Sequence, residues 1–202
     1  AQGIGAGICL ELALEGATVA IADLQKKKSE ELVKKITKLG KNAIAIKADI
    51  SSKESCEQLV EKTVDKLGGL DILINCAAPS RDKTKMMNIS DSDWDIHQSI
   101  VVEASAFLSD VASKHLKASG RGVIVNISSV TSEDVGVGHC SWPYHVSKAG
   151  LNHLTRWLAC RFGSEGIRVN AVSPGLVDRD EGPKLSDNLE HKALVEEVVP
   201  LG

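Results

Sequence analysis

The sequence predicts an α/β protein that forms a single domain over residues 1–202, with a doubly wound parallel sheet between two layers of helices. Three observations predict this fold class. Short apolar runs alternate with longer segments whose apolar residues recur at helical spacing. The short runs are apolar throughout, which is typical of parallel strands covered by helices on both faces. A chain of 202 residues with 43% hydrophobic residues is also long enough to bury one sizeable core.

Each predicted strand is a short run rich in apolar residues. None of these runs approaches the ~20 residues that a membrane-spanning helix needs, so we expect no membrane partner. The predicted strands cover residues 18–23, 43–49, 70–75, 122–128 and 167–174.

The segments between the strands predict amphipathic helices that bury one face against the sheet. Ser51 and Glu54 form a capping-box pattern at the start of one of them. A long helix is predicted at residues 92–116 and another at residues 144–162. In the long helix we expect these residues to point inward: Ile96, Ile100, Ala104, Phe107, Leu108 and Val111.

Composition excludes several classes of function. The formal net charge is −3 and no long basic block occurs, which argues against nucleic-acid binding. The five cysteines are scattered, with no C-x-x-C pair, and the six histidines lack the spacing of metal ligands. We therefore expect a reducing, cytoplasmic location and no metal site.

The first residues, AQGIGAGI, indicate a dinucleotide site. Gly3, Gly5 and Gly7 lead directly into a helix, and glycines there let backbone N–H groups approach a pyrophosphate at the positive end of the helix. Asp23 ends the following strand, 20 residues after Gly3, where a carboxylate can bind the ribose hydroxyls of adenosine. Because a carboxylate repels a 2′-phosphate, the sequence favours NAD over NADP.

A dinucleotide fold needs a central strand before this glycine-rich turn, and residue 1 already lies within the turn. Without that central strand, the strands on either side of it would have no partner to pair with, and the sheet should not be stable. The end, VVPLG, similarly resembles a cut before a final strand. We therefore expect the printed sequence to be part of a longer protein, in which a targeting peptide could precede it.

Six signals occur in the order typical of one family. They are Gly3-Ile4-Gly5 as the second half of T-G-x-x-x-G-x-G, Asp49-Ile50, Asn75-Cys76-Ala77-Ala78 for N-N-A-G, Ser129 at a strand end, Tyr144 to Lys148 as Y-x-x-x-K, and Arg168 to Gly175 as R-V-N-A-V-x-P-G. With these the chain resembles the short-chain dehydrogenase/reductase family over nearly its whole length. The resemblance implies a Rossmann-like sheet of seven parallel strands and a nicotinamide cofactor.

The resemblance also implies the site residues. The catalytic residues would be Ser129, Tyr144 and Lys148. The cofactor would contact Gly3, Ile4, Gly5, Asp23, Leu24, Asp49, Ile50, Asn75, Ala77, Ile127, Tyr144, Lys148, Pro174, Gly175 and Val177. Residues 175–202 would form a flap on the substrate side. The family usually forms homodimers or homotetramers, built in part from the helices at 92–116 and 144–162.

The chemistry of these side chains suits proton transfer to a carbonyl oxygen. Tyr144 is the only tyrosine of the chain, and Lys148 shares its helix face because it lies four residues later. A phenol, with a reference pKa of about 10, exchanges protons poorly near neutrality, but a cation within about 4–6 Å favours the phenolate. Ser129 can bind the substrate oxygen, whereas strand alternation sends Ser128 to the other face.

Three positions depart from the family pattern. Val101 stands where an asparagine usually helps a water relay reach the lysine, and a valine cannot carry a proton. Ala78 replaces the last glycine of N-N-A-G. Arg179 stands where a threonine often contacts the nicotinamide amide; it can pair with an anionic substrate or simply face solvent. Trp142 can line an apolar substrate pocket or pack at the start of its helix.

Three functions remain open from the sequence. The first is an NAD(H)-dependent oxidoreductase that interconverts a small-molecule secondary alcohol and a ketone. The second is a cofactor-binding relative with weak or lost catalysis, acting as a sensor or a partner subunit, which Val101, Ala78 and Arg179 favour. The third, an NADPH-dependent acyl-chain reductase, is disfavoured by Asp23.

Overall fold

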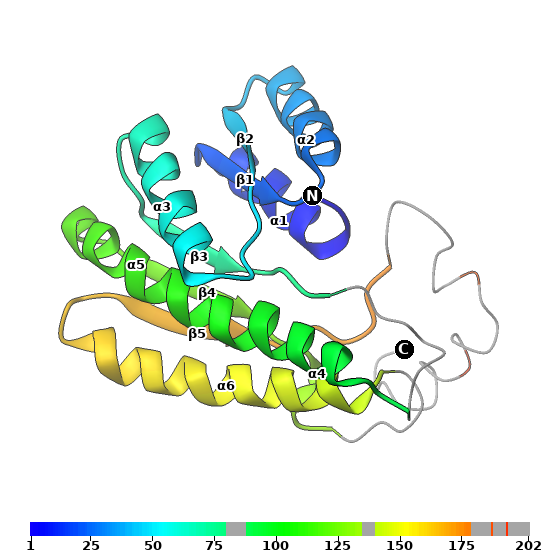
Figure 1. The fold of residues 1–202 in the computed structure, drawn as a ribbon. Coiled ribbons are helices and arrows are strands. Elements are labelled where there is room, and N and C mark those ends of the chain that lie inside the picture. Colours follow the sequence, from blue (N-terminus) through cyan, green and yellow to red (C-terminus); the bar gives the residue numbers. More distant parts are fainter. Residues whose placement is uncertain (80–87, 135–139, 179–186, 188–192, 194–202) are drawn as a thin grey trace.

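The computed structural model describes residues 1–79, 88–134, 140–178, 187 and 193 (Figure 1). Within them, helices and parallel strands alternate along the chain, as the sequence predicts. The elements are α1 (Gly3–Leu14), β1 (Val19–Asp23), α2 (Lys26–Lys38), β2 (Ala43–Lys47), α3 (Lys53–Leu67), β3 (Ile72–Asn75), α4 (Asp91–His97), η1 (Gln98–Glu103), α5 (Ala104–Ser119), β4 (Val123–Ile127), η2 (Val130–Ser132), α6 (Trp142–Gly163) and β5 (Arg168–Val172).

The described strands form two parallel sheets. In one, β1 pairs with β2; in the other, the order is β3-β4-β5. The registers are regular, with Asp23 opposite Lys47 in the first sheet and Asn75 opposite Asn126 in the second. Because all these strands are parallel, their carboxyl ends lie at one edge, where the functional side chains gather. No strand pairing joins β1 to β3 in the described part of the chain.

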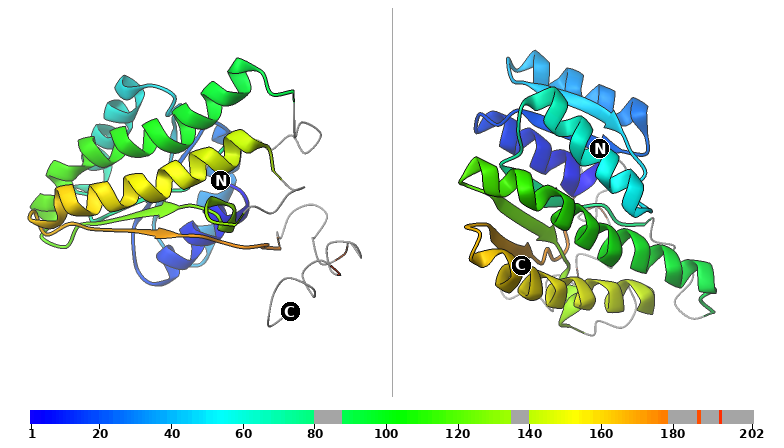
Figure 2. Two further views of the ribbon diagram at one scale, coloured as in Figure 1. Left: turned by 90° about the horizontal axis from the view of Figure 1, so that it is seen from below. Right: turned by 60° about the vertical axis from the view of Figure 1, so that its left-hand side comes forward.

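Helices α1 and α2 lie on one side of the β1–β2 sheet and α3 on the other (Figure 2). In the described part of the chain, α5 and α6 cover one face of the β3-β4-β5 sheet, and Ile72 and Val172 are 39% and 51% exposed. Successive side chains of β1 point to opposite faces of its sheet and pack in different cores. Val19 and Ile21 pack in one core with α1 and α2, whereas Ala20 packs against a second core that contains α3, α5 and α6. The fold is therefore a doubly wound, three-layer α/β/α arrangement, as the sequence predicts.

The long helix predicted at residues 92–116 is divided into α4, the π-helical η1 and α5. Its buried face also differs from the prediction. Ile96 is 47% exposed, so the expectation that it points inward is wrong. The buried residues of this face are His97, Val101, Ala104, Ser105, Leu108, Ser109, Ala112 and Leu116. A π-helical segment adds a residue to the turn and so changes which side chains face the core.

The starts of α3, α4 and α6 each have a local feature that favours the beginning of a helix. The N-cap of α3 is Ser52, whose side chain accepts a hydrogen bond from the backbone N–H of Ser55, so the capping box predicted at Ser51 is wrong by one residue. A capping box is present at Ser90 and Asp93, at the start of α4. Pro143 lies in the first turn of α6, where its missing N–H costs nothing.

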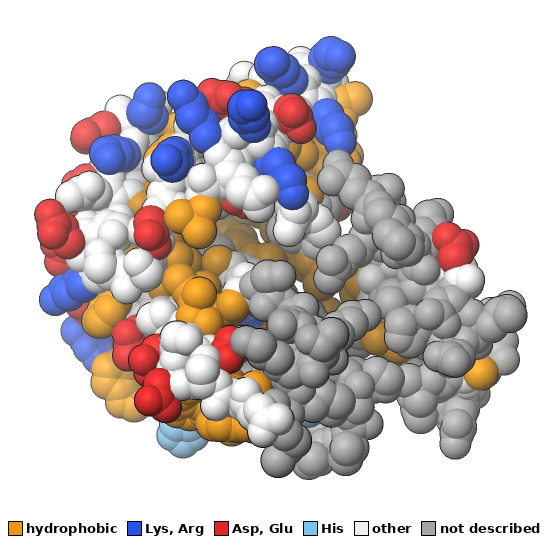
Figure 3. Space-filling model, turned by 45° about the vertical axis from the view of Figure 1, so that its right-hand side comes forward, with side chains coloured by type: hydrophobic (Ala, Val, Ile, Leu, Met, Phe, Trp, Pro, Cys, Tyr) orange, Lys and Arg blue, Asp and Glu red, His pale blue; other side chains and the backbone are white. Residues whose placement is uncertain are grey.

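Two surface properties bear on the excluded partners. No helix among the described residues is both long and apolar enough to cross a membrane. On the face seen in Figure 3, lysines and arginines are interspersed with acidic side chains.

Most of residues 175–202, the predicted flap, lie outside the described residues.

Candidate functional site

The glycine-rich turn opens α1 close to the end of β3. Gly3 begins the helix with φ of 52°, a left-handed conformation that glycine adopts without strain. A Cβ atom at Gly5 would lie 3.4 Å from Sγ of Cys76, which follows β3 directly. The turn therefore packs against the end of β3, and the first backbone N–H groups of α1 lie at this edge of the sheet.

Asp23 lies at the carboxyl end of β1 and accepts hydrogen bonds from the backbone N–H of Gln25, at 2.7 Å, and from the amino group of Ala1. Burial raises the pKa of this carboxyl, but these two hydrogen bonds outweigh it and hold the pKa below its ordinary value. The charge of Lys28 acts in the same direction. Asp23 is therefore a carboxylate at neutral pH.

Asp49 and Ile50 follow β2, one strand away from Asp23. Asp49 is exposed and accepts a hydrogen bond from the backbone N–H of Ser51 at 2.9 Å. That hydrogen bond, with a second from the Ser51 hydroxyl, lowers the pKa of Asp49. The structure thus brings Asp49 to the same edge as Asp23, whereas Leu24 is a 58% exposed residue of the intervening turn.

Asn75 ends β3 in a buried polar network. Its Nδ2 donates to Oδ1 of Asn126 at 2.8 Å, and Nδ2 of Asn126 donates to the Thr155 hydroxyl of α6 at 2.8 Å. The Oδ1 atom of Asn75 is buried and has no hydrogen-bond partner among the described residues. The sequence does not reveal that Asn126 and Thr155 belong to this network, because the contacts join residues far apart in the chain.

Ser129 is buried at the end of β4 and caps the short helix η2. Its Oγ accepts hydrogen bonds from the backbone N–H of Thr131, at 3.3 Å, and from the Thr131 hydroxyl, at 2.9 Å. Ser129 can therefore still donate its own hydroxyl hydrogen. Ser128 lies elsewhere and donates to the backbone carbonyl of Lys148 at 3.3 Å.

Tyr144 and Lys148 are both buried, each 3% exposed, on one face of α6. Lys148 Nζ lies 5.7 Å from the centre of the Tyr144 ring. The same Nζ donates to the backbone carbonyl of Ile127 at 2.6 Å, which ties α6 to the end of β4. The helix spacing predicts this pair, and the contact to Ile127 explains how its buried ammonium is held in place.

Contacts between η2, α6 and the end of β5 complete this part of the site. His145 and Asn152 of α6 hydrogen-bond the Thr131 carbonyl, at 3.0 Å, and the Ser132 hydroxyl, at 2.8 Å. The backbone N–H of Val130 donates to the carbonyl of Pro174 at 3.1 Å. These bonds bring the segments of Ser129, Tyr144 and Pro174–Gly175 together at one edge.

The three positions that depart from the family pattern, Val101, Ala78 and Arg179, have different surroundings in the structure. Val101 is buried in η1, and its carbonyl accepts a hydrogen bond from the Ser105 hydroxyl at 2.8 Å. Ala77 and Ala78 are exposed after β3, and Val177 is 43% exposed beyond β5. Arg179 lies outside the described residues.

Two aromatic contacts lie at the start of α6. The first agrees with one of the two roles predicted for Trp142, packing at the start of its helix, whereas the sequence does not indicate the second. Trp142 stacks on Trp94 of α4, with ring centres 5.3 Å apart. The buried His97 meets the Tyr144 ring edge to face, with ring centres 6.3 Å apart and an interplanar angle of 85°. The spacing of His97, Val101 and Ala104 on one helix face was the signal that could have indicated a buried histidine.

Comparison with known proteins agrees with this arrangement. A family model described as enoyl-(acyl carrier protein) reductase matches residues 1–202. A 3-oxoacyl-[acyl-carrier-protein] reductase of Staphylococcus aureus is 32% identical over 201 residues, which is 99% of this chain and 80% of the relative.

Solved structures are similar over the same extent. A short-chain dehydrogenase from Burkholderia cenocepacia, in complex with NADP, has a TM-score of 0.85 at 32% identity, covering 98% of this chain and 79% of its own. A 7α-hydroxysteroid dehydrogenase, in complex with NADH and 7-oxo glycochenodeoxycholic acid, has a TM-score of 0.82 at 29% identity, covering 92% and 73%.

The family match spans the whole chain, and the fold and the six sequence signals agree with it. Together they identify an oxidoreductase that depends on NAD or NADP and acts on a small molecule. The chain belongs to the short-chain dehydrogenase/reductase family.

Proposed function

We propose that this protein interconverts a secondary alcohol and a ketone, with NAD(H) as cofactor and Tyr144 as the general acid and base. The observation that carries the proposal is the buried pair on α6, in which Lys148 Nζ lies 5.7 Å from the Tyr144 ring centre and is anchored on Ile127. A surface pair at the same spacing would be solvated and of little consequence.

The residues at the sheet edge fit a dinucleotide. The absence of a side chain at Gly5 lets the turn lie against Cys76 and leaves the N-terminus of α1 open to a pyrophosphate. The Asp23 carboxylate would hold the adenosine ribose, and Asp49–Ile50 the adenine. Lys148 would hold the nicotinamide ribose. The unpartnered Oδ1 of Asn75 marks a further polar group at this edge.

A bound nicotinamide cofactor supplies or accepts the hydride at the substrate carbon. The protein must then handle the proton. In reduction, the substrate C=O bond becomes C–O⁻, and the Tyr144 hydroxyl gives its proton to that oxygen. In oxidation, the Tyr144 phenolate takes the proton from the alcohol. The Lys148 ammonium lies 5.7 Å from the centre of the Tyr144 ring, and Ser129 donates a hydrogen bond to the substrate oxygen.

The choice of NAD over NADP is proposed from Asp23, whose carboxylate would repel a 2′-phosphate. The positive charge of Lys28 lies near enough to Asp23 to lower its pKa. Its charge opposes the repulsion without replacing the hydrogen bonds that a carboxylate offers to two ribose hydroxyls. We therefore expect tighter binding of NADH than of NADPH by calorimetry.

A homo-oligomer is also proposed, formed through the outer face of α6. Val146 and Trp157 are 47% and 58% exposed on that face. Large apolar side chains exposed on the same face of a helix favour an interface between copies of the chain. We expect a dimer or a tetramer.

The proposed reaction is tested on a panel of alcohols and ketones that includes a 3-oxoacyl thioester. Turnover of each compound is measured as the change in NADH absorbance. Tyr144→Phe should abolish turnover, by about 10³-fold or more, and still bind NADH with unchanged affinity. Cys160→Ala, an exposed change near the other end of the same helix, serves as the control. Substantial residual turnover in Tyr144→Phe would remove Tyr144 from the mechanism. Binding of NADH without turnover on the whole panel would favour the sensor function.

A further inference from the structure

The ring of Tyr144 contacts a histidine that none of the six sequence signals includes. His97 is the last residue of α4 and is only 6% exposed. Its ring meets the Tyr144 ring edge to face at 85°, with ring centres 6.3 Å apart. Aromatic pairs prefer this geometry because the positive edge of one ring meets the negative face of the other.

The orientation of the His97 ring is itself fixed. Nδ1 of His97 lies 2.7 Å from the backbone carbonyl of Asp93, one turn earlier in α4. A carbonyl oxygen can only accept, so Nδ1 carries the hydrogen. The start of α4 is held by the capping box of Ser90 and Asp93 and by the stacking of Trp94 on Trp142 of α6. His97 is thus positioned on α4, and α4 is positioned on α6.

Val101, one turn after His97, cannot make the contact that His97 makes with Tyr144. Val101 is also buried on this helix and offers only methyl groups, so it can neither hydrogen-bond nor stack on a ring. Its backbone carbonyl is already bonded to the Ser105 hydroxyl. Among these two buried side chains, only His97 can make a directional contact with the phenol ring.

We propose that His97 is a positioning residue that holds the Tyr144 ring in its reactive orientation, in addition to the contact that Lys148 makes from α6. The inference rests on the proposed function, since orientation matters for rate only if Tyr144 transfers the proton. A displacement of about 1 Å in a reacting group can cost about 10²-fold in rate. Lys148 from α6 and His97 from α4 both contact the Tyr144 ring.

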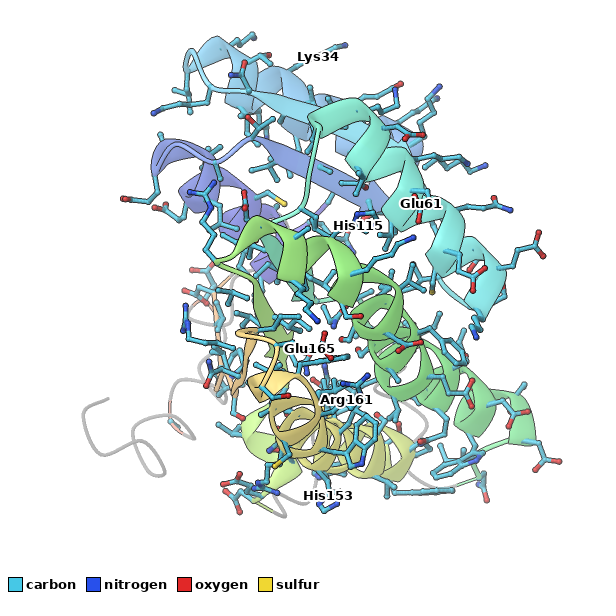
Figure 4. All side chains as sticks on the ribbon, turned by 90° about the vertical axis from the view of Figure 1, so that its left-hand side faces the viewer. Lys34, Glu61, His115, His153, Arg161 and Glu165 are labelled. Carbon is cyan, nitrogen blue, oxygen red and sulfur yellow. The ribbon has the colours of Figure 1, made fainter. Side chains whose placement is uncertain are left out.

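Three variants separate the two contacts of His97. His97→Ala removes both, His97→Phe keeps an aromatic ring against Tyr144 but loses the bond to Asp93, and His97→Asn keeps an N–H donor but no ring. His115→Ala is the matched control, because His115 lies on α5 beside Glu61 of α3, on another part of the same long helix (Figure 4).

Steady-state kinetics on the substrate found by the panel should separate orientation from binding. His97→Ala and His97→Asn should lower kcat by about 10- to 100-fold and leave KM and the NADH affinity within about threefold. His97→Phe should recover kcat to within about threefold of the unchanged protein, and His115→Ala should be unaffected. Recovery by asparagine and not by phenylalanine would overturn the proposal and assign the role to the bond with Asp93.

Nuclear magnetic resonance tests the contact without turnover. Because Tyr144 is the only tyrosine, labelling tyrosine with ¹³C at Cζ gives one signal from the ring concerned. We expect one sharp signal in the unchanged protein and in His115→Ala, and a shifted, broadened or split signal in His97→Ala. An unchanged signal in a folded His97→Ala protein would overturn the proposal. Residual turnover in Tyr144→Phe would instead overturn the proposed function and leave this measurement valid.

Discussion

At the scale of single residues, the site depends on buried and half-buried polar groups that are held by specific hydrogen-bond partners. Lys148 is 3% exposed, and its Nζ donates a hydrogen bond to the Ile127 carbonyl. Asp23 is fixed at the end of β1 by the backbone N–H of Gln25. Buried polar groups remain tolerable only where such bonds replace those to water. These bonds also fix the directions in which Lys148 and Asp23 point.

The role of Asp23 can be tested by removing its charge without changing its shape. Asp23→Asn should weaken the preference for NADH over NADPH by about tenfold or more, because the repulsion of a 2′-phosphate is lost and one acceptor of the ribose hydroxyls becomes a donor. Calorimetric affinities for both cofactors measure this. Glu15→Gln, an exposed change at the end of α1, should leave the ratio as it is. An unchanged ratio in Asp23→Asn would contradict the assignment.

Cys56 gives the protein a predictable weakness at alkaline pH. Burial, together with the charges of Asp49 and Glu57, raises the pKa of its thiol to about 11 from 9.0. A raised pKa means that folding favours the protonated thiol. Its stabilising contribution is therefore complete below pH 9 and is lost as the pH rises towards 11.

We therefore expect the free energy of unfolding to decrease between about pH 9 and pH 11. Cys56→Ala should be less stable at pH 7, by about 1 kcal/mol, and should lack this part of the alkaline decrease. Cys160→Ala, an exposed change on α6, should keep it. Urea unfolding at several pH values provides the measurement. The same alkaline decrease in Cys56→Ala would assign it to another group.

At the scale of elements, the division of the long helix is the feature that most affects the site. The π-helical η1 separates α4 from α5 and sets the rotation of α4, so that His97 and not Ile96 faces α6. Such π-helical insertions are frequent at functional sites. The helices also depend on local caps, of which Ser52 at α3 is one.

The cap of α3 offers a direct comparison of neighbouring serines. Ser52→Ala removes the acceptor for the Ser55 N–H and should lower the free energy of unfolding by about 1 kcal/mol. Ser51→Ala, the position that the sequence pattern favoured, should change it by less than about 0.5 kcal/mol. Thermal or denaturant unfolding distinguishes the two. A larger effect at Ser51 than at Ser52 would contradict the cap seen in the structure.

At the scale of the whole molecule, two cores stabilise opposite sides of the parallel strands. One joins α1 and α2 to β1, and the larger one joins α3, α5 and α6 to β2, β4 and β5. The long helices thereby bury one face and leave the other outward. On α6 that outward face carries Val146 and Trp157.

Trp157→Glu should therefore dissociate the proposed oligomer, because a carboxylate is costly to bury in an interface. Light scattering coupled to size-exclusion chromatography measures the mass. Leu39→Glu, an equally exposed apolar position at the end of α2, should leave the mass unchanged. A monomeric unchanged protein, or an intact oligomer in Trp157→Glu, would contradict an interface on this face.

The sequence by itself determined the order of strands and helices, the parallel α/β class and the pairing of Tyr144 with Lys148. These are local properties: apolar periodicity records which face is buried, and a separation of four residues places two side chains on one helix face. The turn of Gly3 and Gly5 and the position of Asp23 at a strand end are equally local.

Only the tertiary structure decided which distant groups meet. It brings Asn75 to Asn126 and Thr155, Lys148 to the Ile127 carbonyl, and His97 to Tyr144. It also decided that Ile96 is exposed, because the π-helical turn changes the face that α4 presents. Such contacts depend on how elements pack in three dimensions, and the spacing of residues within one element carries no record of the element that will lie against it.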